Sequence, residues 1–91
     1  MLNETTKKLY DEFSRQVYSE GSLTLREKEL IAFACSVMID CKHCMEYHLK
    51  KAMEAGVSAD EINEAAAITM TVAAGKNRGI AQKVIAVTEE K

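Results

Sequence analysis

The chain has 91 residues, of which 47% are hydrophobic and 29% are charged, and its formal net charge is −2. The length predicts a single domain over residues 1–91, and the hydrophobic content excludes a disordered chain. No basic block and no long apolar run occur in the sequence, so we expect no nucleic-acid partner and no membrane span.

The N-terminal residues lack the apolar segment of a signal peptide, which predicts a soluble protein in the cytoplasm. The chain contains three cysteines. An odd number of cysteines in a reducing compartment favours reactive or ligating thiols over a structural disulfide framework.

The sequence contains no proline and four glycines, a composition typical of helices joined by short turns. We therefore predict an all-α fold, a compact helical domain of about five helices. The first helix is expected over residues 3–19, with Gly21 beyond its end. Thr24 and Glu27 have the spacing of a capping box, which predicts a second helix over residues 25–39.

The second helix is rich in apolar residues and is expected to be the most buried of the helices. Cys35 within it is interpreted as a small core residue. Asp40 is interpreted as the N-cap of a third helix that begins at Cys41 and ends at Gly56. This assignment places Cys41 in the first turn of the third helix.

Ser58 and Glu61 repeat the capping-box spacing and predict the start of a fourth helix. Gly75 is expected to end that helix, and a fifth helix should run from about residue 77 to residue 90. The fourth helix is dense in alanine, whose small side chain lets backbones approach closely, either within one domain or between subunits. Because a chain of this length buries a limited share of its surface, we expect a homo-oligomer.

Cys41, Cys44 and His48 are separated by three and four residues, which places all three side chains on one face of a helix. A cysteine at the start of a helix meets free backbone N–H groups and the positive end of the helix dipole, and both favour the thiolate. The C-x-x-C spacing is typical of dithiol oxidoreductases, in which one thiolate attacks and the other resolves the intermediate. A neutral imidazole one turn away can take a thiol proton and return it.

An orienting carboxylate would complete a proton relay through His48, and the sequence offers three candidates. Glu46 is two positions from Cys44 and points away from it. Asp40 is expected to be occupied with capping. Glu29 lies on the preceding helix and could point across at His48.

Metal binding is an alternative to redox chemistry, because Cys41, Cys44 and His48 could supply three zinc ligands, with water or Glu29 as the fourth. A helical assembly with incidental cysteines is a third possibility. A c-type haem is excluded because Met45, and not a histidine, follows Cys44. Three cysteines are too few for a usual single-chain iron–sulfur cluster, and we expect no cofactor.

The segment from Arg26 to Gly75 resembles the carboxymuconolactone decarboxylase superfamily, and in particular its alkylhydroperoxidase D-like branch. The resemblance rests on an E…C-x-x-C-x-x-x-H core, which is formed here by Glu29, Cys41, Cys44 and His48. It extends over the stretches REKELIA, CKHCMEYH and AGVSADEI, and it covers over half of the chain.

The resemblance implies an all-helical fold that assembles as trimers or hexamers, with thiol peroxidase activity toward small hydroperoxides. It implies that Glu29 orients His48, that Cys44 attacks the peroxide and that Cys41 resolves the product as a disulfide. His43 matches a further histidine of that branch. The implied reductant is a dithiol, such as a lipoyl-bearing protein. The decarboxylase branch acts on a lactone acid without a cysteine pair, so the two cysteines argue against that activity.

The order of attack is open to two interpretations. The helix terminus favours a thiolate at Cys41, whereas the resemblance assigns the attack to Cys44. We follow the resemblance, because a stabilised thiolate is also a good leaving group, which suits a resolving Cys41.

Overall fold

The structure, a computed structural model, describes residues 2–89, and these residues form four α-helices and no strand. The helices are α1 (Glu4–Val17), α2 (Leu25–Met38), α3 (Lys42–Glu54) and α4 (Ala59–Glu89). The all-α prediction is therefore confirmed. None of these four helices is long and apolar enough to cross a membrane.

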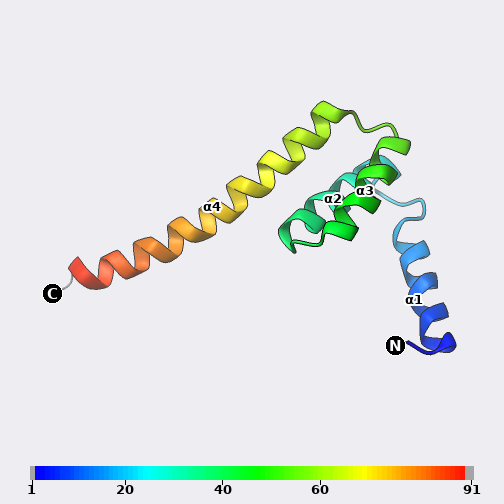
Figure 1. The fold of residues 1–91 in the computed structure, drawn as a ribbon, viewed down its shortest axis with the longest axis horizontal. Helices are drawn as coiled ribbons and strands as arrows, with labels where there is room; N and C mark the ends of the chain where they lie inside the picture. Colours follow the sequence, from blue (N-terminus) through cyan, green and yellow to red (C-terminus); the bar gives the residue numbers. More distant parts are fainter. Residues whose placement is uncertain (1, 90–91) are drawn as a thin grey trace.

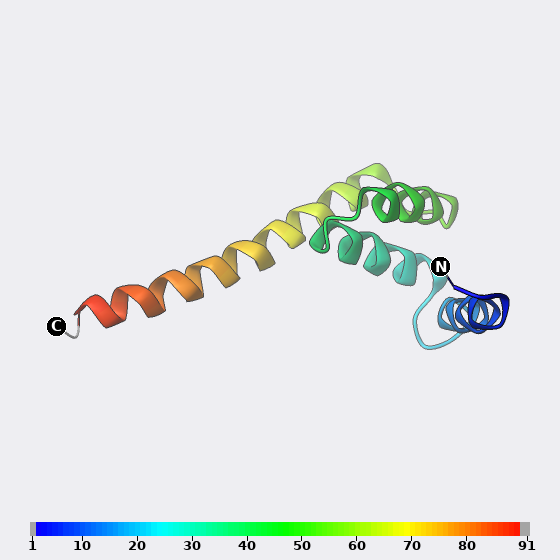
Figure 2. The ribbon, with the colours of Figure 1, turned by 60° about the horizontal axis from the view of Figure 1, so that its bottom comes forward.

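Helices α2 and α3 lie side by side as an antiparallel hairpin, and the first half of α4 packs against α2 (Figure 1; Figure 2). Helix α1 lies to one side of this hairpin, and the second half of α4 extends away from it (Figure 1). The radius of gyration is 18.0 Å, whereas a compact domain of this length has one of about 12 Å. The single chain is thus more extended than the compact domain expected from the sequence.

A small hydrophobic core lies where the hairpin meets the first half of α4. Five buried residues form it: Phe33, Ala52, Val57, Ile62 and Ala65. Partly buried apolar side chains pack around them: Leu30, Val37, Met45, Leu49 and Ala66. Since these residues come from α2, α3, α4 and the connection between α3 and α4, the core fixes the cysteine-bearing helix α3 against α2.

Both predicted capping boxes are present in the structure. The Thr24 N–H donates to Glu27 Oε1 at 2.9 Å, and the Glu27 N–H donates to Thr24 Oγ1 at 3.1 Å. Ser58 and Glu61 make the same two bonds at 2.9 and 3.1 Å. These reciprocal bonds satisfy backbone N–H groups that no helical bond reaches, and they fix where α2 and α4 begin.

The start of α3 differs from the prediction, which placed the N-cap at Asp40. Asp40 has a φ of 55°, in the left-handed region. Cys41 is the N-cap, and its Sγ accepts the Cys44 N–H at 3.2 Å. The reason is the short connection between α2 and α3, in which the chain must reverse its direction. A left-handed residue makes this reversal possible, and aspartate tolerates that conformation better than most residues.

Helix α4 continues through Gly75 to Glu89, so the predicted end at Gly75 and the separate fifth helix are wrong. A glycine inside a helix costs about 1 kcal/mol relative to alanine, which good helix formers on either side can offset. No proline follows Gly75, and a new helix would need a new nucleus, so continuation is favoured over a break. The last residue of the predicted fifth helix, Glu90, lies outside the described residues.

Candidate active site

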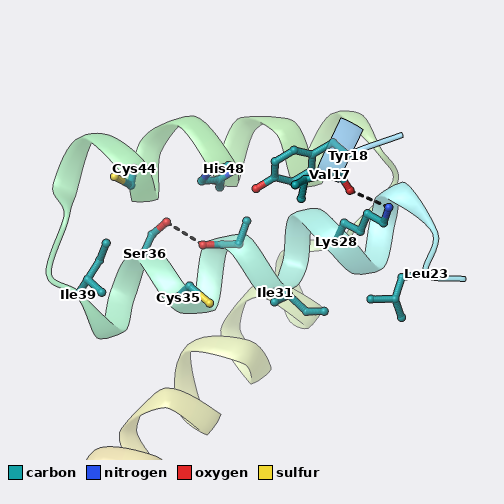
Figure 3. A pocket seen from close by; sticks show the side chains of 11 residues that line it. Val17, Tyr18, Leu23, Lys28, Ile31, Cys35, Ser36, Ile39, Cys44 and His48 are labelled. Atoms are coloured by element: carbon teal, nitrogen blue, oxygen red, sulfur yellow. Dashed lines mark hydrogen bonds between the residues drawn. The ribbon is translucent and has the colours of Figure 1, made fainter. Parts of the chain in front are cut away.

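Cys44 and His48 lie on the side of α3 that is turned toward α2 (Figure 3). Cys41 and Cys44 are joined by a disulfide, with their Cα atoms 5.2 Å apart. The bond connects the N-cap of α3 to its first turn. His48 follows Cys44 after one further turn, on the same side of the helix (Figure 3). The structure thus brings the cysteine pair and the imidazole together on the face that their spacing predicts.

Glu29 reaches His48 from α2. Its Oε2 lies 2.9 Å from His48 Nδ1, and the residue is only 5% exposed. A carboxylate only accepts hydrogen bonds, so the Nδ1–H of the imidazole is the donor, and Nε2 is left to exchange a proton with a thiol. Of the three candidate carboxylates, Glu29 makes this contact, whereas Asp40 and Glu46 are exposed. Because a buried carboxylate needs a partner, the bond fixes both groups.

Two tyrosine rings border the His48 imidazole. The Tyr18 ring stacks on it, with centroids 6.0 Å apart and planes at 24°, and the Tyr47 ring meets it edge-on, with centroids 5.0 Å apart. Burial, and then the nearby charge of Glu29, raise the pKa of Tyr18 above its ordinary value of 10.0, so the phenol stays neutral near pH 7. The sequence did not indicate this neighbour, because Tyr18 lies far from His48 along the chain and no periodic pattern links them.

Two cavities meet at His48. The first has a volume of about 550 Å³ and is lined by Cys44, His48 and mainly apolar side chains (Figure 3). Its apolar wall includes Val17, Leu23, Ile31, Ala32 and Ile39. The second has a volume of about 890 Å³ and more polar walls, which include Glu29. Tyr18 lines both cavities together with His48. The cysteine therefore opens on an apolar space and the carboxylate on a more polar one.

Cys35 is exposed and lines the apolar cavity, so its predicted place in the core is wrong. The buried face of α2 carries Glu29, Phe33 and Ser36, and Cys35 lies outside that face. Ser36 takes the buried position: it is 3% exposed, and its hydroxyl donates to the Ala32 carbonyl at 2.7 Å. The polar Ser36 thus forms part of the cavity wall in a helix that is otherwise rich in apolar residues.

The remaining predicted histidine, His43, is exposed and lines neither of the two cavities. Among residues 2–89, no three His, Cys, Asp or Glu side chains converge so that they could hold a metal ion. Cys41 and Cys44 are instead bonded to each other, and His48 is bonded to Glu29. This arrangement suits proton transfer and thiol–disulfide exchange.

The two sulfurs have different surroundings. Cys41 Sγ accepts the Cys44 N–H at the N-terminus of α3, where the helix dipole favours negative charge. Cys44 lines the apolar cavity together with His48. After reduction, a molecule in this cavity would meet Cys44, while Cys41 would be held by the backbone one turn before it.

Fold and site together define an all-helical protein with a disulfide-forming C-x-x-C pair and a histidine–glutamate pair beside it. The sequence profile of the carboxymuconolactone decarboxylase family matches residues 4–89. The chain belongs to this family, which confirms the resemblance found in the sequence.

Three known proteins are similar to this chain in sequence or structure. A protein of Paracoccus denitrificans called uncharacterized protein 4 in cox locus is 35% identical over 77 residues, which cover 85% of this chain and 69% of that protein. The crystal structure of a protein from Methanobacterium thermoautotrophicum has a TM-score of 0.83 and 39% identity, covering 88% of this chain and 90% of that one. A carboxymuconolactone decarboxylase family protein of Thermotoga maritima, for which involvement in the antioxidative response has been suggested, has a TM-score of 0.69 and 33% identity, covering 79% of this chain and 61% of that one.

Proposed function

We propose that this protein is a thiol-dependent peroxidase of the alkylhydroperoxidase D-like type, which reduces small hydroperoxides with the Cys41–Cys44 pair. The observation that carries the proposal is a disulfide one helical turn from an imidazole that is itself held by the buried Glu29. The role suggested for the Thermotoga maritima relative agrees with it. Because the decarboxylase activity of the family does not depend on a cysteine pair, we do not assign that activity to this chain.

In the first step, His48 takes the Cys44 thiol proton at Nε2, and the thiolate attacks the distal oxygen of the hydroperoxide. The O–O bond breaks, Cys44 is oxidised to a sulfenic acid, and the alkoxide leaves as an alcohol with the proton from His48. Glu29 holds Nδ1 protonated throughout, so Nε2 is the ring nitrogen that carries the moving proton.

In the second step, the Cys41 thiolate attacks the sulfur of the Cys44 sulfenic acid. The S–O bond breaks, the hydroxide leaves as water with the proton that the Cys41 thiol had given up, and the disulfide forms. The two cysteines have then supplied the two electrons that the peroxide accepted. A dithiol reductant, such as a lipoyl-bearing protein, restores both thiols by exchange and is itself oxidised to a disulfide. This need for a dithiol is the reason that we propose a cytoplasmic location.

The test is peroxide consumption by the purified protein with a dithiol reductant. We expect Cys44→Ser to lower turnover by at least about a hundredfold, since the attacking sulfur is gone. Lys50→Ser, at an exposed position of α3 that lines neither of the two cavities at His48, should keep turnover within about twofold of wild type. Equal turnover by wild type and Cys44→Ser would overturn the proposal.

We also propose that the protein acts as a homo-oligomer, a trimer or hexamer. The support is the large number of exposed apolar side chains, which include a stripe on α4 formed by Ile80, Val84 and Val87. Exposed apolar patches of this extent mark association surfaces. The double variant Ile80→Lys/Val84→Lys should shift the mass measured by light scattering toward the monomer, and Gln82→Lys on another side of α4 should not. A monomeric wild type at micromolar concentration would contradict this proposal.

A further inference from the structure

Tyr18 links α1 to the candidate site. It is the C-cap of α1, and its ring stacks on the His48 imidazole with centroids 6.0 Å apart. We propose that Tyr18 is a positioning residue that holds the His48 imidazole in the orientation that bonds Glu29. The inference rests on the proposed role of His48 as the proton carrier. The proposal gives a role to Tyr18, which takes no part in the two reaction steps of the proposed peroxidase.

Lys28 fixes Tyr18 in this place. Its Nζ donates to the Val17 carbonyl at 2.8 Å and to the Ser19 carbonyl at 2.6 Å, which are the residues on either side of Tyr18. Figure 3 shows the Lys28 side chain reaching the backbone next to the Tyr18 ring. Lys28 precedes Glu29 on α2, so one turn of α2 both supplies Glu29 and anchors Tyr18.

This anchor matters because α1 has little other support within the chain. None of its residues is buried, and the extensive helix contacts of residues 2–89 join α2 to α3 and α2 to α4. Without Lys28, the end of α1 would be free to move, and Tyr18 with it. The two hydrogen bonds from Lys28 to backbone carbonyls therefore hold the Tyr18 ring in a fixed place relative to α2.

The imidazole needs such a neighbour because its χ2 torsion has a broad energy profile. Glu29 fixes one ring nitrogen, the Tyr47 edge borders the ring from α3, and Tyr18 stacks on its face. Removal of the stacked ring would let the imidazole tilt or flip, and Nε2 would then spend less time directed at Cys44. Small losses of orientation at a reacting group reduce rates strongly.

The test uses the reduced protein and two measurements that need no peroxide. The first is the rate at which iodoacetamide alkylates Cys44 at neutral pH, followed by mass spectrometry of the Cys44 peptide. The second is the NMR correlation spectrum of the His48 imidazole, which reports whether Nδ1 stays protonated and bonded. The variants are Tyr18→Ala, which removes the ring, and Tyr18→Phe, which keeps it. Tyr10→Ala is the matched control, since Tyr10 is an exposed tyrosine of α1.

We expect Tyr18→Ala to slow Cys44 alkylation by about tenfold and to average the His48 signals. Tyr18→Phe and Tyr10→Ala should stay within about twofold of wild type and keep the His48 signals of wild type. Wild-type alkylation and a wild-type His48 spectrum in Tyr18→Ala would overturn the proposal. Because neither measurement involves peroxide, a wild type without peroxidase activity would refute the proposed function and leave this test valid.

The contribution of Lys28 is separated by a double-mutant cycle. Lys28→Met removes both carbonyl bonds and should slow Cys44 alkylation by about threefold, while Tyr18→Ala/Lys28→Met should match Tyr18→Ala alone. Rates that fall by the product of the two single effects would show that Lys28 acts elsewhere and would overturn the anchoring role. Circular dichroism on each variant confirms that the helices are intact before the rates are compared.

Discussion

The two halves of α4 belong to one continuous helix but have opposite surroundings. In the first half, Ile62 and Ala65 are each 8% exposed and Thr69 is 5% exposed, because they pack on α2. In the second half, Ile80 is 53% exposed and Val84 is 64% exposed. The same kind of apolar side chain is therefore part of a core at one end and covered by nothing in the described chain at the other.

This difference shows what the single chain can and cannot stabilise by itself. The first half of α4 is held by tertiary contacts, whereas the second half depends on its own backbone hydrogen bonds. Isolated helices of this length are marginal in water. The apolar stripe of Ile80, Val84 and Val87 therefore needs a cover from outside the chain, which agrees with the proposed homo-oligomer.

The largest effect is expected from the same truncation made in each half of α4. Ile62→Ala should lower the free energy of unfolding by about 3 kcal/mol, since it leaves a cavity in the core. Ile85→Ala, which lies off the apolar stripe and is 54% exposed, should lower it by about 0.5 kcal/mol or less. Urea unfolding measures both values. Equal losses of unfolding free energy would show that the second half of α4 is as buried in solution as the first, and would contradict the contrast between the two halves.

The next effect concerns activity, and it contrasts a glutamate of the hairpin with one at the far end of α4. Glu29→Gln removes the charge that holds His48 and should lower the turnover of peroxide by about ten- to a hundredfold. Glu89→Gln should leave turnover unchanged, because Glu89 is exposed and ends α4, whose second half extends away from the hairpin (Figure 1). A full-rate Glu29→Gln protein in the steady-state assay would remove Glu29 from the proton relay.

A smaller effect is expected from alanine at two glycines with different conformations. Gly75 is helical and a Cβ there would meet nothing within 4 Å, so Gly75→Ala should stabilise the protein by about 0.5–1 kcal/mol. Gly56 has a φ of 94°, so Gly56→Ala should destabilise it by about 1 kcal/mol or more. Thermal unfolding of both variants gives the sign of each change in stability. A destabilising Gly75→Ala would indicate that another chain approaches α4 closely at this point.

The smallest effect is a dependence of the protein's stability on pH, which arises where the first half of α4 meets α2. The Ser58 N–H, and then the Arg26 side chain, lower the pKa of Glu61 from 4.5 to about 2. Because the pKa is lower in the folded state, this stabilisation is complete above pH 4.5 and is lost as the pH falls toward 2. The melting temperatures of wild type and Glu61→Gln should therefore converge as the pH is lowered through this range. A constant difference between them would refute the linkage, and Glu64→Gln serves as the control.

Local signals in the sequence were sufficient for much of the fold. The capping boxes at Thr24 and Ser58 were predicted correctly because they consist of hydrogen bonds between residues three positions apart. The cap at Asp40 was predicted wrongly because the reversal between α2 and α3 depends on how the two helices pack. The end at Gly75 was predicted wrongly because one glycine does not outweigh the helix formers that follow it.

The site was predictable where it lies on one helix and less so where it joins several. The spacing of Cys41, Cys44 and His48 placed them together on α3. By its spacing alone Glu29 was one of three candidates, because a contact between two helices cannot be inferred from the spacing of residues along one helix. Tyr18 was missed for the same reason, since its place depends on Lys28 bonds to the backbone.

The second helix is the most buried of the four, as predicted, but the residues on its buried face were misjudged for a related reason. The buried face of this helix carries the polar Glu29 and Ser36 beside Phe33, whereas Ile31 and Cys35 are exposed. Hydrophobicity indicates which side chains avoid water in the final assembly. It does not indicate which of them the single chain covers.

The Cys41–Cys44 bond joins residues only three positions apart. A crosslink stabilises a protein chiefly by restricting its unfolded chain, and a ring this short restricts it by about 2 kcal/mol, less than a longer ring would. Breaking or forming this disulfide therefore neither moves distant segments of the chain apart nor requires the core to rearrange. The molecule can pass through its oxidation cycle repeatedly without refolding, and its melting temperature should fall on reduction by less than the loss of a long-range disulfide would cause.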